Sequence, residues 1–72
     1  MIRFLRYSLN HERRIRAVLM ENDKMVQMNL TVTALDGETF AFVSAKQKTP
    51  RTLPLTALMA AGYARGDNGE ND

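Results

Sequence analysis

Few side chains in this sequence of 72 residues could take part in catalytic chemistry. The single histidine, His11, stands beside Glu12, and such a pair moves protons in an enzyme only when a pocket and a positioned substrate complete it. Ser8 and Ser44 have no partner for a charge relay other than that histidine, so neither hydroxyl is expected to act as a nucleophile. The sequence therefore predicts a protein that is not an enzyme.

Metal and cofactor chemistry has no better support. Carboxylates fall at predicted turns and strand ends, where acidic residues usually serve solubility and turn geometry; they are Glu12, Glu21, Asp23, Asp36 and Glu38. Structural zinc sites are built from cysteine and histidine, and this chain has no cysteine. We expect no metal, no cofactor and no disulfide.

Basic side chains suggest binding instead. Residues 1–16 hold five arginines and one glutamate, so five positive charges less one negative leave +4, while the whole chain carries +2. The candidates for binding nucleic acid or a small ligand are Arg14, Arg16, Lys46, Lys48 and Arg51. Together with amide and hydroxyl side chains they could contact phosphate oxygens. The same residues also suit a solvated surface, and no exposed aromatic pair is predicted that would stack bases.

A half-buried strand is the element that must position these residues. From Val26 to Ala34 apolar and polar residues alternate, which is typical of a strand with one buried face. Upstream, residues 14–20 form a second predicted strand, joined to the first by a two-residue turn at Asn22-Asp23. This turn pairs three sets of apolar residues on one face: Leu19 with Val26, Ala17 with Met28, and Ile15 with Leu30.

The following hairpin has two possible registers. A two-residue loop at Asp36-Gly37 would place Phe40 and Phe42 on the threonine face of the preceding strand. A three-residue loop, Leu35-Asp36-Gly37, would instead pair Val32 with Phe40 and Leu30 with Phe42, with Gly37 as a left-handed bulge residue. We predict the second register, because burying two phenylalanines is worth roughly 3–6 kcal/mol.

The remaining segments complete a small sheet. Residues 2–10 fit two structures: a strand, with Ile2 and Phe4 on one face and Leu5, Tyr7 and Leu9 on the other, or a helix, with Ile2, Leu5 and Leu9 on one stripe. Of the two we favour the short helix. Residues 51–55 form a short edge strand, since Pro54 cannot donate to a ladder. Thr56 is expected to cap one helical turn over residues 57–59, and Tyr63-Ala64 to add a last strand.

Apolar residues also fall on the face opposite the predicted core: Val18, Met20, Met25, Ala41 and Val43. They indicate either that the sheet closes into a barrel or that another chain covers them. Closure of the barrel is the simpler interpretation.

The order of elements resembles the WYL-type module, a small Sm-like or SH3-like barrel of bacterial regulators. Thr39-Phe40-Ala41 stands where that family has its Trp-Tyr-Leu triplet. The segment from Arg51 to Leu58, with Leu53 and Leu55, stands where the family has a later Arg-x-Phe-Arg-Leu run, and Pro54 replaces the second arginine. The resemblance implies a barrel and a regulatory binding role.

We thus predict a mainly β protein: a five-stranded SH3-like or Sm-like open barrel with a short amino-terminal helix. One domain covers residues 1–64, and an acidic, disordered tail covers residues 65–72. No apolar run approaches the roughly 20 residues of a membrane span, and no secretory signal is recognised, so we expect a cytoplasmic location. Because so small a core is only marginally stable, we expect a protein partner or a homo-oligomer; nucleic acid is the alternative partner.

Overall fold

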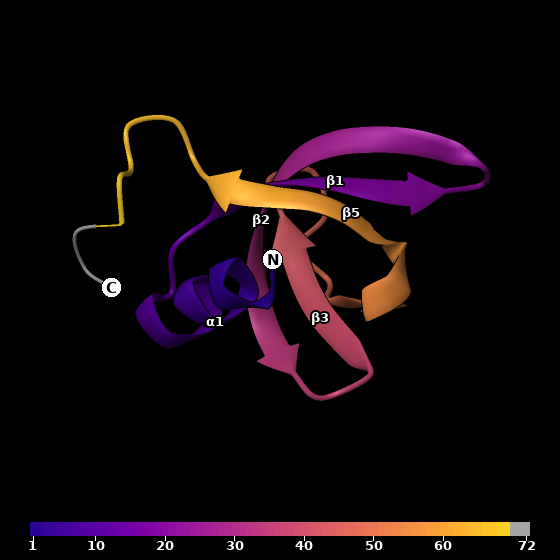
Figure 1. Cartoon of the computed structure of the whole chain (residues 1–72), viewed down its shortest axis with the longest axis horizontal. Coiled ribbons are helices and arrows are strands. Elements are labelled where there is room, and N and C mark those ends of the chain that lie inside the picture. The colour runs from indigo at the N-terminus through magenta and orange to yellow at the C-terminus, as the bar shows by residue number, and fades with distance from the viewer. Residues whose placement is uncertain (70–72) are drawn as a thin grey trace.

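The computed structural model describes residues 1–69 and shows one open, five-stranded antiparallel sheet with a helix at its amino-terminal end (Figure 1). The strand order is β4-β3-β2-β1-β5. The elements are α1 (Ile2–His11), β1 (Ile15–Glu21), β2 (Lys24–Leu35), β3 (Thr39–Ser44), β4 (Arg51–Pro54), the 3-10 turn η1 (Leu55–Ala57) and β5 (Leu58–Tyr63). The predictions of a mainly β chain, five strands and an amino-terminal helix are confirmed.

One long strand, β2, belongs to two halves of this sheet. Its first half pairs with β1 and its second half with β3, and Leu30 has a partner on both sides, Ile15 and Ser44. In Figure 1, β1 and β5 run across the direction of β3 and of the second half of β2. The sheet curls far enough that Arg51, at the start of β4, forms an ion pair with Glu21, at the end of β1.

The β1–β2 hairpin has the predicted register. Leu19 pairs with Val26, Ala17 with Met28 and Ile15 with Leu30, without interruption. The two turn residues, Asn22 and Asp23, have φ values of 50° and 63°, as a type I′ turn requires. Short polar residues of this kind tolerate that conformation, which is why the turn could be located from the sequence.

The predicted register of the β2–β3 hairpin is wrong. Val32 pairs with Phe42, not Phe40, and Phe40 pairs with Leu35. The pairing shifts between Val32 and Ala34, so the extra residue of the bulge is Thr33. Beyond that bulge the alternation is reversed, so Ala34, predicted in the core, is exposed.

The turn itself explains why Gly37 is not left-handed. The Asp36 carboxylate accepts hydrogen bonds from the backbone N–H groups of Glu38, at 2.8 Å, and Thr39, at 2.7 Å. These bonds, that of Thr39 first, hold the pKa of Asp36 below its usual value. The turn is therefore closed by an aspartate side chain, and Gly37 is not among the residues with positive φ.

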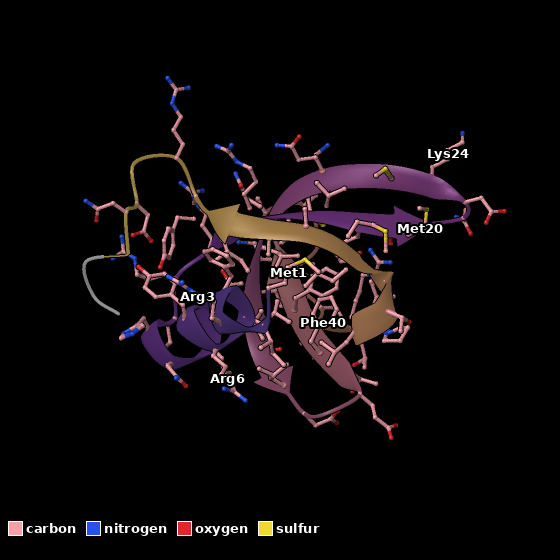
Figure 2. All side chains as sticks on the ribbon, in the orientation of Figure 1. Met1, Arg3, Arg6, Met20, Lys24 and Phe40 are labelled. Carbon is pink, nitrogen blue, oxygen red and sulfur yellow. The ribbon has the colours of Figure 1, made fainter. Side chains whose placement is uncertain are left out.

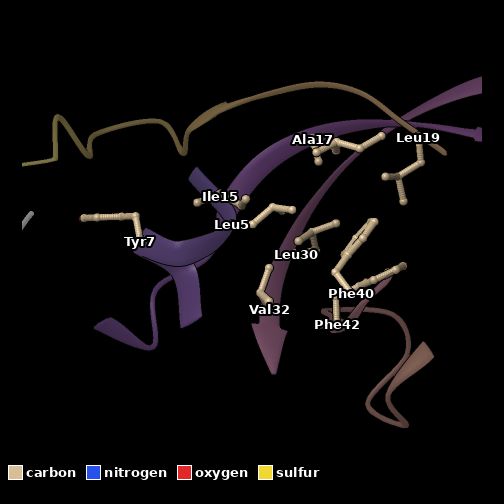
Figure 3. Packing of buried hydrophobic residues seen from close by; sticks show 10 residues of the cluster. Leu5, Tyr7, Ile15, Ala17, Leu19, Leu30, Val32, Phe40 and Phe42 are labelled. Atoms are coloured by element: carbon tan, nitrogen blue, oxygen red, sulfur yellow. The ribbon is translucent and has the colours of Figure 1, made fainter. Parts of the chain in front are cut away.

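The face assigned to the two rings is nevertheless confirmed. Phe40 and Phe42 are each 1% exposed and stack with their centroids 5.5 Å apart. Figure 3 shows them beside Leu30 and below Leu19, the apolar side chains of β1 and β2. A bulge at Thr33 keeps both rings in the core as well as a bulge at Gly37 would have done.

The helix packs on the sheet through part of the predicted stripe, because Leu5 is in the core and Leu9 packs against it, as predicted. Leu5, Tyr7 and Ser8 are buried, whereas Ile2 is 41% exposed. The Ser8 hydroxyl accepts a hydrogen bond from the backbone N–H of Val32, at 2.9 Å. Because β1 begins only at Ile15, Val32 has no strand beside it on that side, and the helix supplies the missing acceptor.

The carboxyl-terminal third of the chain departs from prediction in detail. Pro54 does lie on an edge strand, as predicted. Thr56 caps nothing through its side chain, because the turn spans Leu55–Ala57 and begins after Pro54. The last strand covers Leu58–Tyr63 and pairs with β1. Of the predicted disordered tail, residues 70–72 lie outside the described part, and the structure gives residues 65–69 contacts that are set out below.

No helix within residues 1–69 is long and apolar enough to pass through a membrane.

Candidate interaction surfaces

Asn29 lies on the face of the sheet opposite the core, here called the outer face, and Arg14 and Arg16 are on the same face. Arg51 is not, because it pairs with the buried Phe42. Three shallow hollows share Asn29 in their linings. The first is bounded by Arg16 and Arg65, the second by Arg14 and Lys48. The third extends to Lys46, Gln47 and Arg51 beyond the open side of β2. The fold thus brings Arg14, Arg16, Lys46 and Lys48 to hollows that border Asn29, and Arg51 reaches the third hollow from the core side of the sheet.

This basic outer face has a uniform charge. None of the residues that line the three hollows is acidic. Within residues 1–69, no ion pair is formed by Arg14, Arg16, Arg65, Lys46 or Lys48. Hydrated cations around an amide side chain can bind phosphate or carboxylate groups, and both the Coulomb attraction and the amide hydrogen bonds favour such ligands.

Arg51 differs from the other predicted residues. Its guanidinium forms an ion pair with Glu21 and lies 5.5 Å from the centre of the Phe42 ring. These contacts hold β4 against the end of β1, which is a structural role, although Arg51 also reaches the third hollow. Its charge is partly neutralised, so Arg51 is a weaker candidate for ligand binding than Arg14 or Arg16.

Arg65 was missed by the sequence analysis, which placed it at the start of a disordered tail. It joins the basic outer face because β5 pairs with β1 as far as Tyr63, opposite Ile15. The chain therefore leaves the sheet beside Arg16, and Arg65 lines the same hollow. Only the pairing partner of β5 would have revealed this, and the sequence does not specify that partner.

The residues considered for catalysis have other surroundings. The Ser8 hydroxyl donates to the carbonyl of Arg13 at 2.6 Å and accepts from Val32, so it is occupied in the protein interior. The imidazole of His11 is exposed and lies 5.0 Å from the ring of Tyr7, centroid to centroid. Ser44, the last residue of β3, accepts an exposed hydrogen bond from Gln47 N–H through its hydroxyl. Among the described residues, no group of three His, Cys, Asp or Glu side chains could hold a metal ion.

A second surface lies along β5, which ends the sheet on one side. Its residues, Leu58 to Tyr63, include no charged residue and no proline. The other edge strand, β4, is shorter, begins with Arg51 and ends with Pro54. Natural edge strands are usually protected from further pairing by charges, prolines or shortness. β4 has these protections and β5 does not.

The register shows which backbone groups of β5 are free. In a two-residue hairpin the flanking residues form a hydrogen-bonded pair, so the backbone of Glu21 faces Lys24 on β2. Backbone direction alternates along a strand, so Val18, three residues earlier, faces its partner Ala60 on β5. The next residue of β5, Ala61, must then direct its N–H and C=O away from β1. We call this open side of the strand the β5 edge.

Apolar side chains lie on the outer face of β5 and of the two strands behind it. On the outer face, Val18 pairs with Ala60, and Met20 pairs with Met25 across the first hairpin. Met20 is 37% exposed and Met25 is 64% exposed, so curling of the sheet does not cover them, contrary to the simpler interpretation above. Figure 2 shows Met20 near the end of β1, toward the tip that bears Lys24. We call these four residues the methionine patch.

The segment after β5 is held against the helix by Asp67. Its carboxylate accepts hydrogen bonds from Gly69 N–H at 2.9 Å, from the Tyr7 hydroxyl at 2.7 Å and from Arg13 Nε at 3.1 Å. These bonds, that of Gly69 first and that of Tyr7 next, hold the pKa of Asp67 below its usual value. Tyr7 also packs edge-on against Tyr63, with centroids 5.1 Å apart. The sequence contained no sign of this cluster.

Comparison of the chain with protein-family models, with curated proteins and with solved structures gives no match in any of the three. The kinship with WYL-type modules therefore stays a prediction, and the functional argument rests on the two surfaces, the basic outer face and the β5 edge.

Proposed function

We propose that this chain is a non-enzymatic binding module, of a regulatory kind, that works through protein–protein contact at the β5 edge. The observation that supports this most directly is an uncharged edge strand of six residues that lacks proline. Unpaired N–H and C=O groups in a row are a template for another strand, and many modules recognise partners by adding one to a sheet edge. The methionine patch, on the strands behind this edge, is a further exposed apolar area of an adaptable kind.

The curled sheet is consistent with this proposal and with the predicted barrel. β5 returns to pair with β1 after a meander through β2, β3 and β4, and a 3-10 turn joins β4 to β5. We propose that the fold is a small barrel of the SH3-like or Sm-like type, as the resemblance to WYL-type modules implies. In such a module the side chains that fill the interior serve stability, and recognition falls to edges and outer faces.

The experiment is an NMR titration of the isotopically labelled chain with a synthetic peptide that copies residues 56–65. If the β5 edge accepts a strand, amide shifts change along β5 and along the neighbouring β1 but not along β4. The Ala61→Pro variant removes the outward-facing N–H and should weaken binding about tenfold or more, by ~1.4 kcal/mol. Thr52→Lys, on the exposed face of β4, is the matched control and should bind as the parent does. Unchanged β5 amides at saturating peptide would refute the proposal.

The basic outer face supports a second candidate, the binding of nucleic acid or of a small anionic ligand. Its support is the group of cations near Asn29, of which Arg14, Arg16, Lys46 and Lys48 form no ion pair within residues 1–69, and the lack of any acid in the linings of the three hollows. A labelled oligonucleotide of arbitrary sequence should then be retained at low salt and released as salt rises, because phosphate contacts displace condensed counterions. Arg16→Ala should weaken retention and reduce the salt slope by about one unit. Arg6→Ala, on the exposed side of α1, is the control. Absence of binding at low salt would eliminate this candidate.

A further inference from the structure

We propose that the partner of the β5 edge is β5 of a second copy of this chain, paired antiparallel about a two-fold axis. This inference rests on the proposed function and narrows it to one occupant. It is drawn from the distribution of charge along the strand and from the differences between the two edges.

A strand that pairs with itself about a two-fold axis brings each residue near the symmetry-related residues of the other copy. Charges of one sign near the axis would therefore face each other and repel. Residues 58–63 are uncharged, so the β5 edge satisfies this condition. Arg65 lies just beyond one end of the strand, and antiparallel pairing places the two copies of it at opposite ends of the seam. At about 3.3 Å per residue this separates them by roughly 20 Å or more, beyond a Debye length at physiological salt.

The opposite edge of the sheet is a poor alternative partner. β4 offers only four residues, from Arg51 to Pro54, and Pro54 has no N–H to donate. Pro50 precedes the strand, and Arg51 is already bound to Glu21. A head-to-tail contact of β5 with β4 of another copy would gain few hydrogen bonds. When β5 pairs with β5 of a second copy, in contrast, the free backbone N–H and C=O groups of both strands can form hydrogen bonds.

The methionine patch lies on the same side of the sheet in both copies, on β5 and on the two strands behind the seam. When identical strands pair antiparallel within a continuous sheet, the axis stands normal to the sheet, so the outer faces of both copies lie on the same side. Of the patch, only Ala60 borders the seam; Val18 lies one strand behind it on β1, and Met20 and Met25 lie beyond the last pair of β1 with β5. A seam of one strand pair is small, and we therefore expect a reversible dimer.

The test uses the whole chain and has two parts. Sedimentation equilibrium over a wide concentration range should show a mass that rises toward twice that of the monomer. Ala61→Pro should raise the dissociation constant about tenfold or more, and Thr52→Lys should leave it unchanged. Because the chain has no cysteine, single cysteines introduced at residues 60, 61 or 62 can report proximity. Opposed residues of antiparallel strands lie about 4.5–5.5 Å apart between Cα atoms, within disulfide range, so at least one variant should oxidise to a covalent dimer and Thr52→Cys should not.

Each outcome decides between the two proposals. A concentration-dependent dimer with a disulfide in β5 supports the inference. A chain that stays monomeric at every concentration, yet binds the peptide at β5, overturns the second copy as occupant and leaves the proposed function standing. A chain that neither dimerises nor binds the peptide overturns both. A dimer that cross-links through Thr52→Cys but not through β5 places the contact on β4 and also overturns the inference.

Discussion

The hydroxyl of Ser8 accepts a hydrogen bond from the backbone N–H of Val32, 2.9 Å away, and this bond joins the helix to the middle of the sheet. It occurs at the point where β2 has lost β1 as a neighbour but continues alongside β3. A side chain thus completes a ladder that the strands leave unfinished. Without it, one buried backbone donor would lack an acceptor.

Ser8→Ala should therefore lower the free energy of unfolding by about 1–3 kcal/mol, the usual cost of a buried donor left unsatisfied. The measurement is urea denaturation followed by circular dichroism. Ser44→Ala is the control, because the Ser44 hydroxyl, at the end of β3, accepts an exposed hydrogen bond at 3.2 Å, and its removal should cost less than about 0.5 kcal/mol. Equal midpoints for the two variants would show that the helix is held by other contacts.

Gly37→Ala should be tolerated. No heavy atom lies within 4 Å of a Cβ added at Gly37, and its φ is not positive. Replacing glycine where its conformation suits any residue commonly stabilises by about 0.4–1 kcal/mol. Gly66→Ala is the matched comparison, also in open space but with φ of 85°, and it should lose about 1–2 kcal/mol. If both variants were equally destabilised, Gly37 would be left-handed after all.

Stability should fall in acid partly through Asp67. Its folded-state pKa lies below the ordinary 3.8, so the ionised carboxylate stabilises the fold at pH values above 3.8 and this contribution is lost as pH drops through the folded pKa. Asp67→Asn should destabilise the chain at neutral pH, and the gap from the parent should narrow as the pH is lowered below 3.8.

Asp23→Asn provides the control for that titration. Asp23 is exposed in the first turn, where asparagine accepts the same left-handed backbone. The variant should follow the parent in urea denaturation at each pH. A gap between Asp67→Asn and the parent that stayed constant with pH would mean that Asp67 does not hold the segment after β5 through its charge.

The two hairpins show how far the sequence could predict this fold. Asn22-Asp23 gives the first turn a backbone that few other pairs adopt, so one register was possible. In the second hairpin, the gain from burial predicted the face on which Phe40 and Phe42 lie. A bulge at Gly37 and a bulge at Thr33 both place the two rings on that face, so burial could not distinguish the two registers. The choice was made by the Asp36 carboxylate, through bonds that exist only once the turn has formed.

Contacts between distant segments were beyond prediction for the same reason. Alternation alone placed Arg14 and Arg16 on the outer face, and the structure surrounds Asn29 with them. Arg65 needed the pairing of β5 with β1, and the ion pair of Arg51 with Glu21 needed the curl of the whole sheet. Neither contact can be predicted from the local pattern of residues, because each depends on where a later segment of the chain packs in the fold.

Leu30, which has partners in both β1 and β3, also bears on how the molecule comes apart. Both hairpins contain this residue, so loss of pairing in one hairpin also disturbs the last residue pair of the other. The free energy of opening one hairpin then includes a cost in the other hairpin. The two hairpins therefore do not open independently. We therefore expect this short chain to unfold as one cooperative unit.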